Sequence, residues 1–205
     1  MILFINACVR AGSRTKRLAD RLLSALGGQV EEIRLDAFSF PVVDETYLEK
    51  RERCVLARDF GHPLLEPAAR FSKADEIVIA SPLWDLSFPA VLKRYLELVN
   101  VVGVTFRYTA AGVPEGLCRA KRLFYVTTAG GDIVPDEYGF GYIRALAQTF
   151  YGIRDVRLIK AIGLDLAGAD PESIIQQTME QIDAVYGRMT DGQPEEPAGG
   201  QCETP

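Results

Sequence analysis

Short apolar runs alternate along this chain with longer segments whose apolar residues recur at helical spacing. Buried parallel strands give such continuous runs, while strict alternation indicates an edge strand. The predicted strands are residues 1–6, the alternating 29–35, 76–81, 122–128 and 156–164. The predicted helices are residues 13–26, 47–60, 64–74, 90–101, 138–151 and a last one from Pro171 to about Met189. Asp170 and Pro171 make a good N-cap and first residue for that last helix.

Strands and helices that alternate in this way predict an α/β protein with a doubly wound parallel sheet. Five strands favour the flavodoxin-like order 2-1-3-4-5, a three-layer fold, over the six-stranded dinucleotide-binding order. Residues 190–205 contain proline, glycine and acidic residues but almost no apolar ones. We therefore expect one domain over residues 1–189 and a disordered tail over 190–205.

Composition narrows the kinds of partner. The chain has 205 residues, enough for one full-sized domain, and a net charge of −5, which argues against nucleic acid. No apolar run is long enough to span a membrane, and the first residues lack the flanks of a signal peptide. The four cysteines are scattered and His62 is the only histidine, so we expect a cytoplasmic protein without a metal site.

Three loops should meet in such a sheet, because ligands bind beyond the carboxyl ends of the strands where the winding reverses. They are residues 7–15, 82–88 and 128–132. In the first loop Ser13 and Thr15 flank Arg14 where a helix begins, and free amides there favour an anion. The alternative is that Ser13 is an ordinary helix cap.

The other two loops suggest a flat ligand. Leu83, Trp84, Leu86 and Phe88 are apolar in a loop where solvent is expected, so they either contact a flat ring or pack the core or a dimer. Gly130 and Gly131 follow a strand, where their amides can donate to a carbonyl edge or simply form a turn. Each signal alone is weak. Together they describe a mononucleotide that carries a large ring.

Two stretches carry a family resemblance. Residues 102–117 read VGVTFRYTAAGVPEGL, and the preceding helix, residues 92–99, reads LKRYLELV. Both closely resemble the corresponding segments of the FMN-dependent NADH:quinone oxidoreductases and azoreductases, within the wider NAD(P)H dehydrogenase group of flavodoxin-like folds. The resemblance extends from Met1 to about residue 187.

The resemblance implies which residues hold the cofactor FMN. The family's phosphate loop falls on Ser13, Arg14 and Thr15, its isoalloxazine segment on Pro82, Leu83, Trp84, Asp85 and Leu86, and its polar-edge segment on Thr128, Ala129, Gly130 and Gly131. Three positions depart from the family: Ala7 replaces a serine, Asp85 an asparagine and Ala129 an arginine. A carboxylate at Asp85 would disfavour the anionic reduced flavin if it lay beside the ring.

The resemblance also implies an activity. Hydride passes from NADH or NADPH to flavin N5 and then to a quinone or azo compound that takes the same place, which gives ping-pong kinetics. The family's members are homodimers with the pocket at the interface. Phe106 and Tyr108 would then form a wall that contacts the acceptor, or they would only pack the dimer.

Other classes of function compete with this interpretation. Cys8 and Arg14 spell the C-x5-R-[ST] motif of low-molecular-weight tyrosine phosphatases, but the loop lacks that family's internal G-N. A flavodoxin-type electron carrier is a second alternative, although residues 103–117 favour a closed small-molecule pocket. A flavin-binding regulatory protein is a third, supported only by Asp85 and Ala129.

Overall fold

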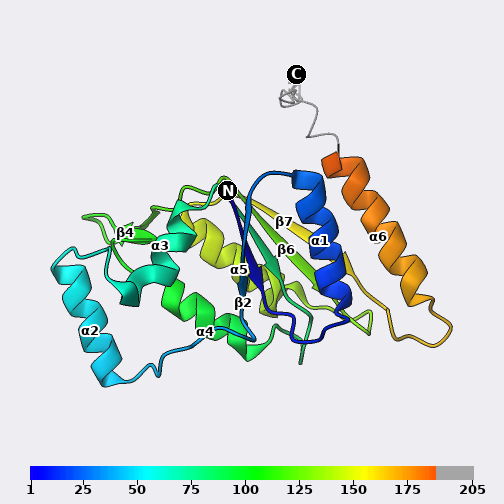
Figure 1. The fold of residues 1–205 in the computed structure, drawn as a ribbon, viewed down its shortest axis with the longest axis horizontal. Coiled ribbons are helices and arrows are strands. Elements are labelled where there is room, and N and C mark those ends of the chain that lie inside the picture. Colours follow the sequence, from blue (N-terminus) through cyan, green and yellow to red (C-terminus); the bar gives the residue numbers. More distant parts are fainter. Residues whose placement is uncertain (188–205) are drawn as a thin grey trace, which may run out of the picture.

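Five parallel strands form the centre of the structure, a computed structural model that describes residues 1–187 (Figure 1). Their order is β2-β1-β3-β6-β7, which confirms the predicted order 2-1-3-4-5. The strands are β1 (Ile2–Asn6), β2 (Val30–Arg34), β3 (Glu76–Ala80), β6 (Arg122–Thr128) and β7 (Asp155–Ala161). The predicted tail, residues 190–205, and the predicted helix end at Met189 lie outside the described residues.

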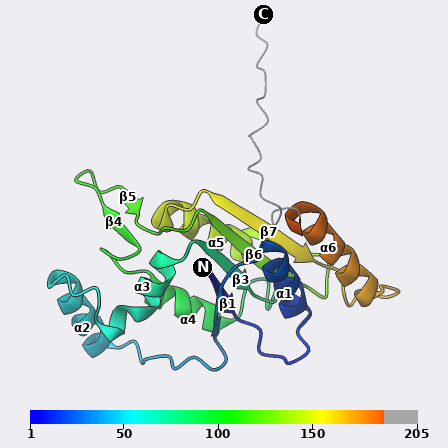
Figure 2. The same cartoon turned by 45° about the horizontal axis from the view of Figure 1, so that its top comes forward.

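Helices cover both faces of this sheet and complete the three predicted layers (Figures 1 and 2). The helices α1 (Arg14–Leu26) and α6 (Pro171–Tyr186) pack on one face, where Leu18, Leu22 and Ile175 meet Phe4, Val78 and Phe124. On the other face lie α3 (Glu66–Lys73), α4 (Ala90–Val99) and α5 (Phe140–Leu146), where Phe71, Tyr95 and Ile143 meet Leu3, Ile77 and Leu123. Successive strand residues point to opposite faces, so the apolar runs fill both cores.

Two predicted element ends are wrong, each for a local reason, and a third element ends where predicted but consists of two parts. The last strand ends at Ala161 instead of residue 164, because Gly163 turns the chain with a φ of 73°. The helix predicted over 47–60 is α2 (Glu45–Leu56), which Asp44 caps and which stops before Arg58, whose φ is 55°. The helix predicted over 138–151 is α5 followed by a π-helical turn, η3 (Ala147–Tyr151).

Residues 103–117, which the sequence left without secondary structure, contain a small hairpin of β4 (Phe106–Tyr108) and β5 (Pro114–Gly116). Gly116 lies directly on the turn that precedes β7, since a Cβ added there would be 2.1 Å from the nitrogen of Gly152. The ring of Phe106 packs on that of Phe150 at 4.5 Å between centroids. The hairpin therefore sits at the amino ends of β6 and β7, far from α1 and α6 in both views (Figures 1 and 2).

Among residues 1–187 no helix has both the length and the apolar character needed to cross a membrane.

Candidate functional site

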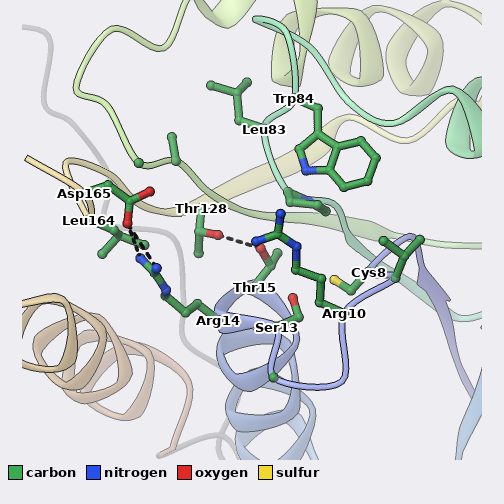
Figure 3. Close-up of a pocket in the computed structure, with 15 residues that line it drawn as sticks. Cys8, Arg10, Ser13, Arg14, Thr15, Leu83, Trp84, Thr128, Leu164 and Asp165 are labelled. Atoms are coloured by element: carbon green, nitrogen blue, oxygen red, sulfur yellow. Dashed lines mark hydrogen bonds and ion pairs between the residues drawn. The ribbon is translucent and has the colours of Figure 1, made fainter.

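A cleft of about 340 Å³ opens at the carboxyl ends of the parallel strands (Figure 3). Small-molecule sites usually occupy about 300–1,000 Å³. We call it the carboxyl-end cleft, and it is lined by Cys8, Val9, Arg10, Gly12, Ser13, Arg14, Thr15, Pro82, Leu83, Trp84, Thr128, Ala129, Gly130, Leu164 and Asp165. The three loops predicted to meet do meet here, together with a fourth loop that follows β7.

The first loop presents backbone and hydroxyl donors. The hydroxyl of Ser13 accepts from the amide of Lys16 at 3.3 Å, so Ser13 is a helix cap and also lines the cleft. The buried Thr15 hydroxyl lies 2.6 Å from that of Thr128 and ties the first loop to the third. The first turn of α1 contains no acidic residue, and in the described part of the chain the amides of Arg14 and Thr15 reach no protein acceptor. This end of the cleft suits an anion.

The second loop divides its predicted residues into two groups. Pro82, Leu83 and Trp84 line the cleft, and the Trp84 side chain is 40% exposed. Trp84 and Ser87 then exchange two backbone hydrogen bonds of 2.9 and 2.8 Å, which close a tight turn.

The tip of that turn is strained and lies outside the cleft lining. Asp85 and Leu86 have φ angles of 50° and 67°, and a leucine in this left-handed region costs on the order of 1 kcal/mol or more. Both side chains are exposed. The carboxylate of Asp85 is therefore not among the groups that line the cleft.

The third loop uses its carbonyl groups to accept hydrogen bonds from the loop after β7, while two of its amides stay free among the described residues. The oxygens of Ala129, Gly130 and Gly131 accept from the amides of Leu164, Asp165 and Gly163 at 3.2, 2.9 and 2.9 Å. Within residues 1–187 the amides of Gly130 and Gly131 have no acceptor. Thr128, Ala129 and Gly130 line the cleft, whereas Gly131 lies just outside its lining. Such free amides are ready donors for a polar ligand edge.

Sequence reasoning missed the fourth loop, which contributes Leu164 and Asp165. Both terminal nitrogens of Arg14 lie 3.0 Å from one carboxylate oxygen of Asp165, so the first loop is also tied to this one. A Cβ on Gly130 would lie 2.2 Å from the other oxygen of Asp165, so a side chain at this position would clash with that carboxylate. The topological rule that found the other loops applies here too, because β7 is the neighbour of β6, but the strand prediction extended through Leu164.

The geometry of Cys8 disfavours the phosphatase alternative. Cys8 is 7% exposed, and its sulfur lies 3.8 Å from the carbonyl oxygen of Ala80. Burial raises the pKa of the Cys8 thiol above its ordinary value of 9.0, whereas a nucleophilic cysteine needs a lowered pKa. The Arg14 of the motif is engaged with Asp165.

Phe106 and Tyr108 lie at the opposite edge of the sheet from the carboxyl-end cleft. Phe106 is buried against Phe150, while Tyr108 is 53% exposed on the hairpin. His62 caps a short turn, with its Nδ1 accepting from the amide of Leu64 at 3.1 Å. Across residues 1–187 no three His, Cys, Asp or Glu side chains gather in a way that would hold a metal ion.

Sequence comparison places the chain among known proteins. Residues 1–185 match a protein family described as having the flavodoxin-like fold. An FMN-dependent NADH:quinone oxidoreductase of Clostridium perfringens is 40% identical over 123 residues, which are 59% of this chain and 61% of that protein. One of the same name from Coprothermobacter proteolyticus is 32% identical over 184 residues, 83% of this chain and 89% of that protein. The chain thus spans about three-fifths of the first relatives it matches, and more of others.

Structural comparison agrees on the fold. An azoreductase from Bacillus anthracis superposes with a TM-score of 0.78 at 23% identity, covering 91% of this chain and 98% of that one. An FMN-dependent NADH-azoreductase from the same species, solved in complex with FMN, gives a TM-score of 0.77 at 24% identity, covering 92% and 98%. At this level of identity the likeness speaks for the architecture.

Proposed function

The chain belongs to the family of proteins with the flavodoxin-like fold, and on that premise we propose that it is an FMN-dependent NAD(P)H oxidoreductase that reduces quinones or azo compounds. The observation that carries the proposal is the meeting of free backbone donors with an apolar wall in one cleft. Support also comes from the relatives, which are named FMN-dependent NADH:quinone oxidoreductases, and from the azoreductase neighbours.

The donor set of the cleft fits a phosphorylated ring at both ends. At one end, the hydroxyl of Ser13 and the amides of Arg14 and Thr15 would hold the phosphate. At the other, Pro82, Leu83 and Trp84 would hold the ring through the apolar contacts that their side chains offer. The amides of Gly130 and Gly131, with Thr128 and Ala129 beside them, would donate to the ring's polar edge.

The remaining predicted residues, Asp85 and Leu86, extend this wall beyond the cleft lining. We infer that they contact the ring through the turn's backbone, since both side chains are exposed. The exposed position of Asp85 also allows its charge to be screened by water, which lessens its effect on the reduced ring.

FMN, when bound, supplies the hydride chemistry that no side chain of this cleft provides. The chain's own residues would position the ring and leave one of its faces open beside Trp84, which is 40% exposed. A nicotinamide, either NADH or NADPH, and then the acceptor would use that open face in turn. This order of events predicts ping-pong kinetics.

We propose that the protein is a homodimer in which the hairpin of a second copy covers the open side of the cleft. Within one chain Phe106 and Tyr108 are too far from the cleft to contact an acceptor, and Tyr108 is 53% exposed on the hairpin. On this account Tyr108→Ala keeps its stability and FMN affinity but raises the KM for quinone. An unchanged KM for quinone in this variant would mean that the hairpin only packs against other parts of the protein and does not contact the acceptor.

We also propose that the protein works in the reducing cytoplasm on small molecules, without nucleic acid, membrane or metal partners. The three cysteines among the described residues are free thiols, which suits that compartment.

The test is the visible spectrum of the purified protein, recorded anaerobically before and after NADH or NADPH. We expect flavin bands that bleach with the nicotinamide and return when a quinone is added. A colourless protein that ignores added FMN would contradict the proposal. Bands that resist both nicotinamides would instead favour the electron-carrier alternative.

A further inference from the structure

Four basic residues gather at the amino end of α1, and all but one are already paired. Arg14 lies 3.0 Å from Asp165, Lys16 lies 2.7 Å from Asp20, and Arg17 makes two bonds of 2.8 and 2.7 Å to Glu172. The fourth, Arg10, has no ion pair and no side-chain hydrogen bond within residues 1–187. Of these four charges, that of Arg10 is therefore the one that no described residue compensates.

A tight turn fixes where Arg10 stands. The amide of Ser13 donates to the carbonyl oxygen of Arg10 at 3.1 Å, so the two residues lie across one turn from each other. Arg10 lines the carboxyl-end cleft. Figure 3 shows its side chain rising from the loop into the cleft on the side of Trp84, while Arg14 turns the other way to meet Asp165.

A phosphate monoester needs more positive charge than the rest of this cleft offers. Such a group carries about −1.5 to −2 charges at neutral pH, whereas a helix amino end contributes roughly half a charge. The charge of Arg14 is offset by Asp165, so its net contribution is small. The guanidinium of Arg10, which lies across the turn from Ser13, would supply the missing charge. A guanidinium can also bind two phosphate oxygens at once.

We propose that Arg10 selects the phosphorylated cofactor, by pairing its guanidinium with the flavin phosphate, and that Arg14 acts mainly through Asp165 to hold the loops together. This inference rests on the proposed FMN site. It distinguishes two arginines of one loop, of which the family resemblance assigns only Arg14.

The test compares two ligands that differ only in the phosphate. Apoprotein is titrated with FMN and with riboflavin, and binding is followed by the quenching of flavin fluorescence. In Arg10→Gln we expect FMN affinity to fall about tenfold, the usual size of one charge-assisted bond at an open site, with riboflavin affinity unchanged. Arg10→Lys should recover part of the loss, because it restores a point charge but not the fork.

Two further measurements sharpen the result. Arg17→Gln is the matched control, because it removes a cation of the same helix end that pairs with Glu172 outside the cleft lining, and it should leave both affinities unchanged. Raising the ionic strength should weaken FMN binding to the unmodified protein more than to Arg10→Gln.

The outcomes separate the inference from the function beneath it. Equal losses for FMN and riboflavin in Arg10→Gln would overturn the phosphate role. An unchanged FMN affinity with a raised KM for NADPH would also overturn it and would assign the charge to the nicotinamide. An unmodified protein that binds neither flavin would refute the proposed function itself.

Discussion

The two edges of one sheet differ in how their polar groups are satisfied. At the amino ends of β3 and β6 lies a hollow of about 530 Å³, against about 340 Å³ for the carboxyl-end cleft, and its charged lining residues other than Lys121 take part in ion pairs. Asp75 lies 2.6 Å from the amino group of Met1 and 2.7 Å from Arg119, and Glu76 pairs with Arg122. At the carboxyl ends, amides and Arg10 are left without protein partners among the described residues. The free backbone amides, more than the volume of the hollow, are therefore the reason why we propose the carboxyl-end cleft as the binding site.

Glycines show the same contrast. Near the amino edge Gly116 has no room for a side chain, because the backbone of Gly152 fills the space a Cβ would need. On the carboxyl side, Gly12 and Gly131 have nothing within 4 Å of an added Cβ. Gly116 thus serves close packing at the amino edge, whereas at the carboxyl edge Gly12 and Gly131 leave space open and Gly130 makes room for Asp165.

The largest effect is expected at Gly116. In Gly116→Val the new Cβ would meet backbone at 2.1 Å, so the hairpin must separate from η3. We expect a loss of roughly 3 kcal/mol or more in the free energy of unfolding, measured by urea denaturation. Gly12→Ala is the matched change at the other edge and should leave stability within about 0.5 kcal/mol. Equal losses in the two variants would break the comparison.

Ser13→Ala should have an intermediate effect on two readouts. Loss of the helix cap costs about 1 kcal/mol of stability, and loss of a donor should also weaken FMN binding. Asp170→Ala removes the cap of α6, whose carboxylate accepts from Glu172 and Ser173 at 3.1 and 3.3 Å. It should cost similar stability with no change in FMN affinity. If both variants weakened FMN binding equally, Ser13 would affect FMN only through the stability of the fold.

Much of the fold could be predicted because its signals are local. The strands at the centre of the sheet are buried on both faces, so their apolar runs are continuous. Helix ends are marked by Ser13 and Asp170, whose side chains cap helix amides, and by Gly27, whose backbone ends α1. The hairpin could not be found this way. Its strands pair over three residues each and depend on the contact of Gly116 with Gly152, which is distant in sequence.

The site was predictable to the extent that topology determines it. The order of the strands places the loops of Ser13, Leu83 and Gly130 together, and the cleft confirms that meeting. Leu86 is exposed because its backbone is left-handed, a conformation that leucine disfavours. Its exposure therefore could not be predicted from the residue type. The role that we propose for Tyr108 depends on a second copy of the chain, about which one sequence says nothing.

A smaller effect, present at neutral pH and lost in acid, is expected at the amino edge. The amino group of Met1 and then Arg119 hold the pKa of Asp75 below its ordinary value of 3.8. Since the folded state favours the charged form, this stabilisation is present above pH of about 4 and is lost as the pH falls through the lowered pKa. Asp75→Asn should therefore unfold at slightly lower urea concentration at pH 7 and match the unmodified protein near pH 2. A difference that persists near pH 2 would contradict this origin.

The smallest effect is expected at Cys8. Because burial raises the pKa of the Cys8 thiol above its ordinary value, the thiol is mostly protonated at pH 7. Iodoacetamide should therefore react slowly at pH 7 and faster as the pH rises past 9. Cys8→Ser should keep FMN binding and NADH oxidation at the level of the unmodified protein. Phosphatase activity that disappears in this variant would revive the thiol-based alternative.

Amide chemical shifts offer the most direct test that the carboxyl edge is the binding edge. A ¹⁵N–¹H spectrum of the apoprotein would be recorded as FMN is added. We expect the amides of Arg14, Thr15, Gly130 and Gly131 to shift and those of Asp75 and Arg119 to stay in place. Shifts confined to Asp75 and Arg119, or none at saturating FMN, would contradict the account.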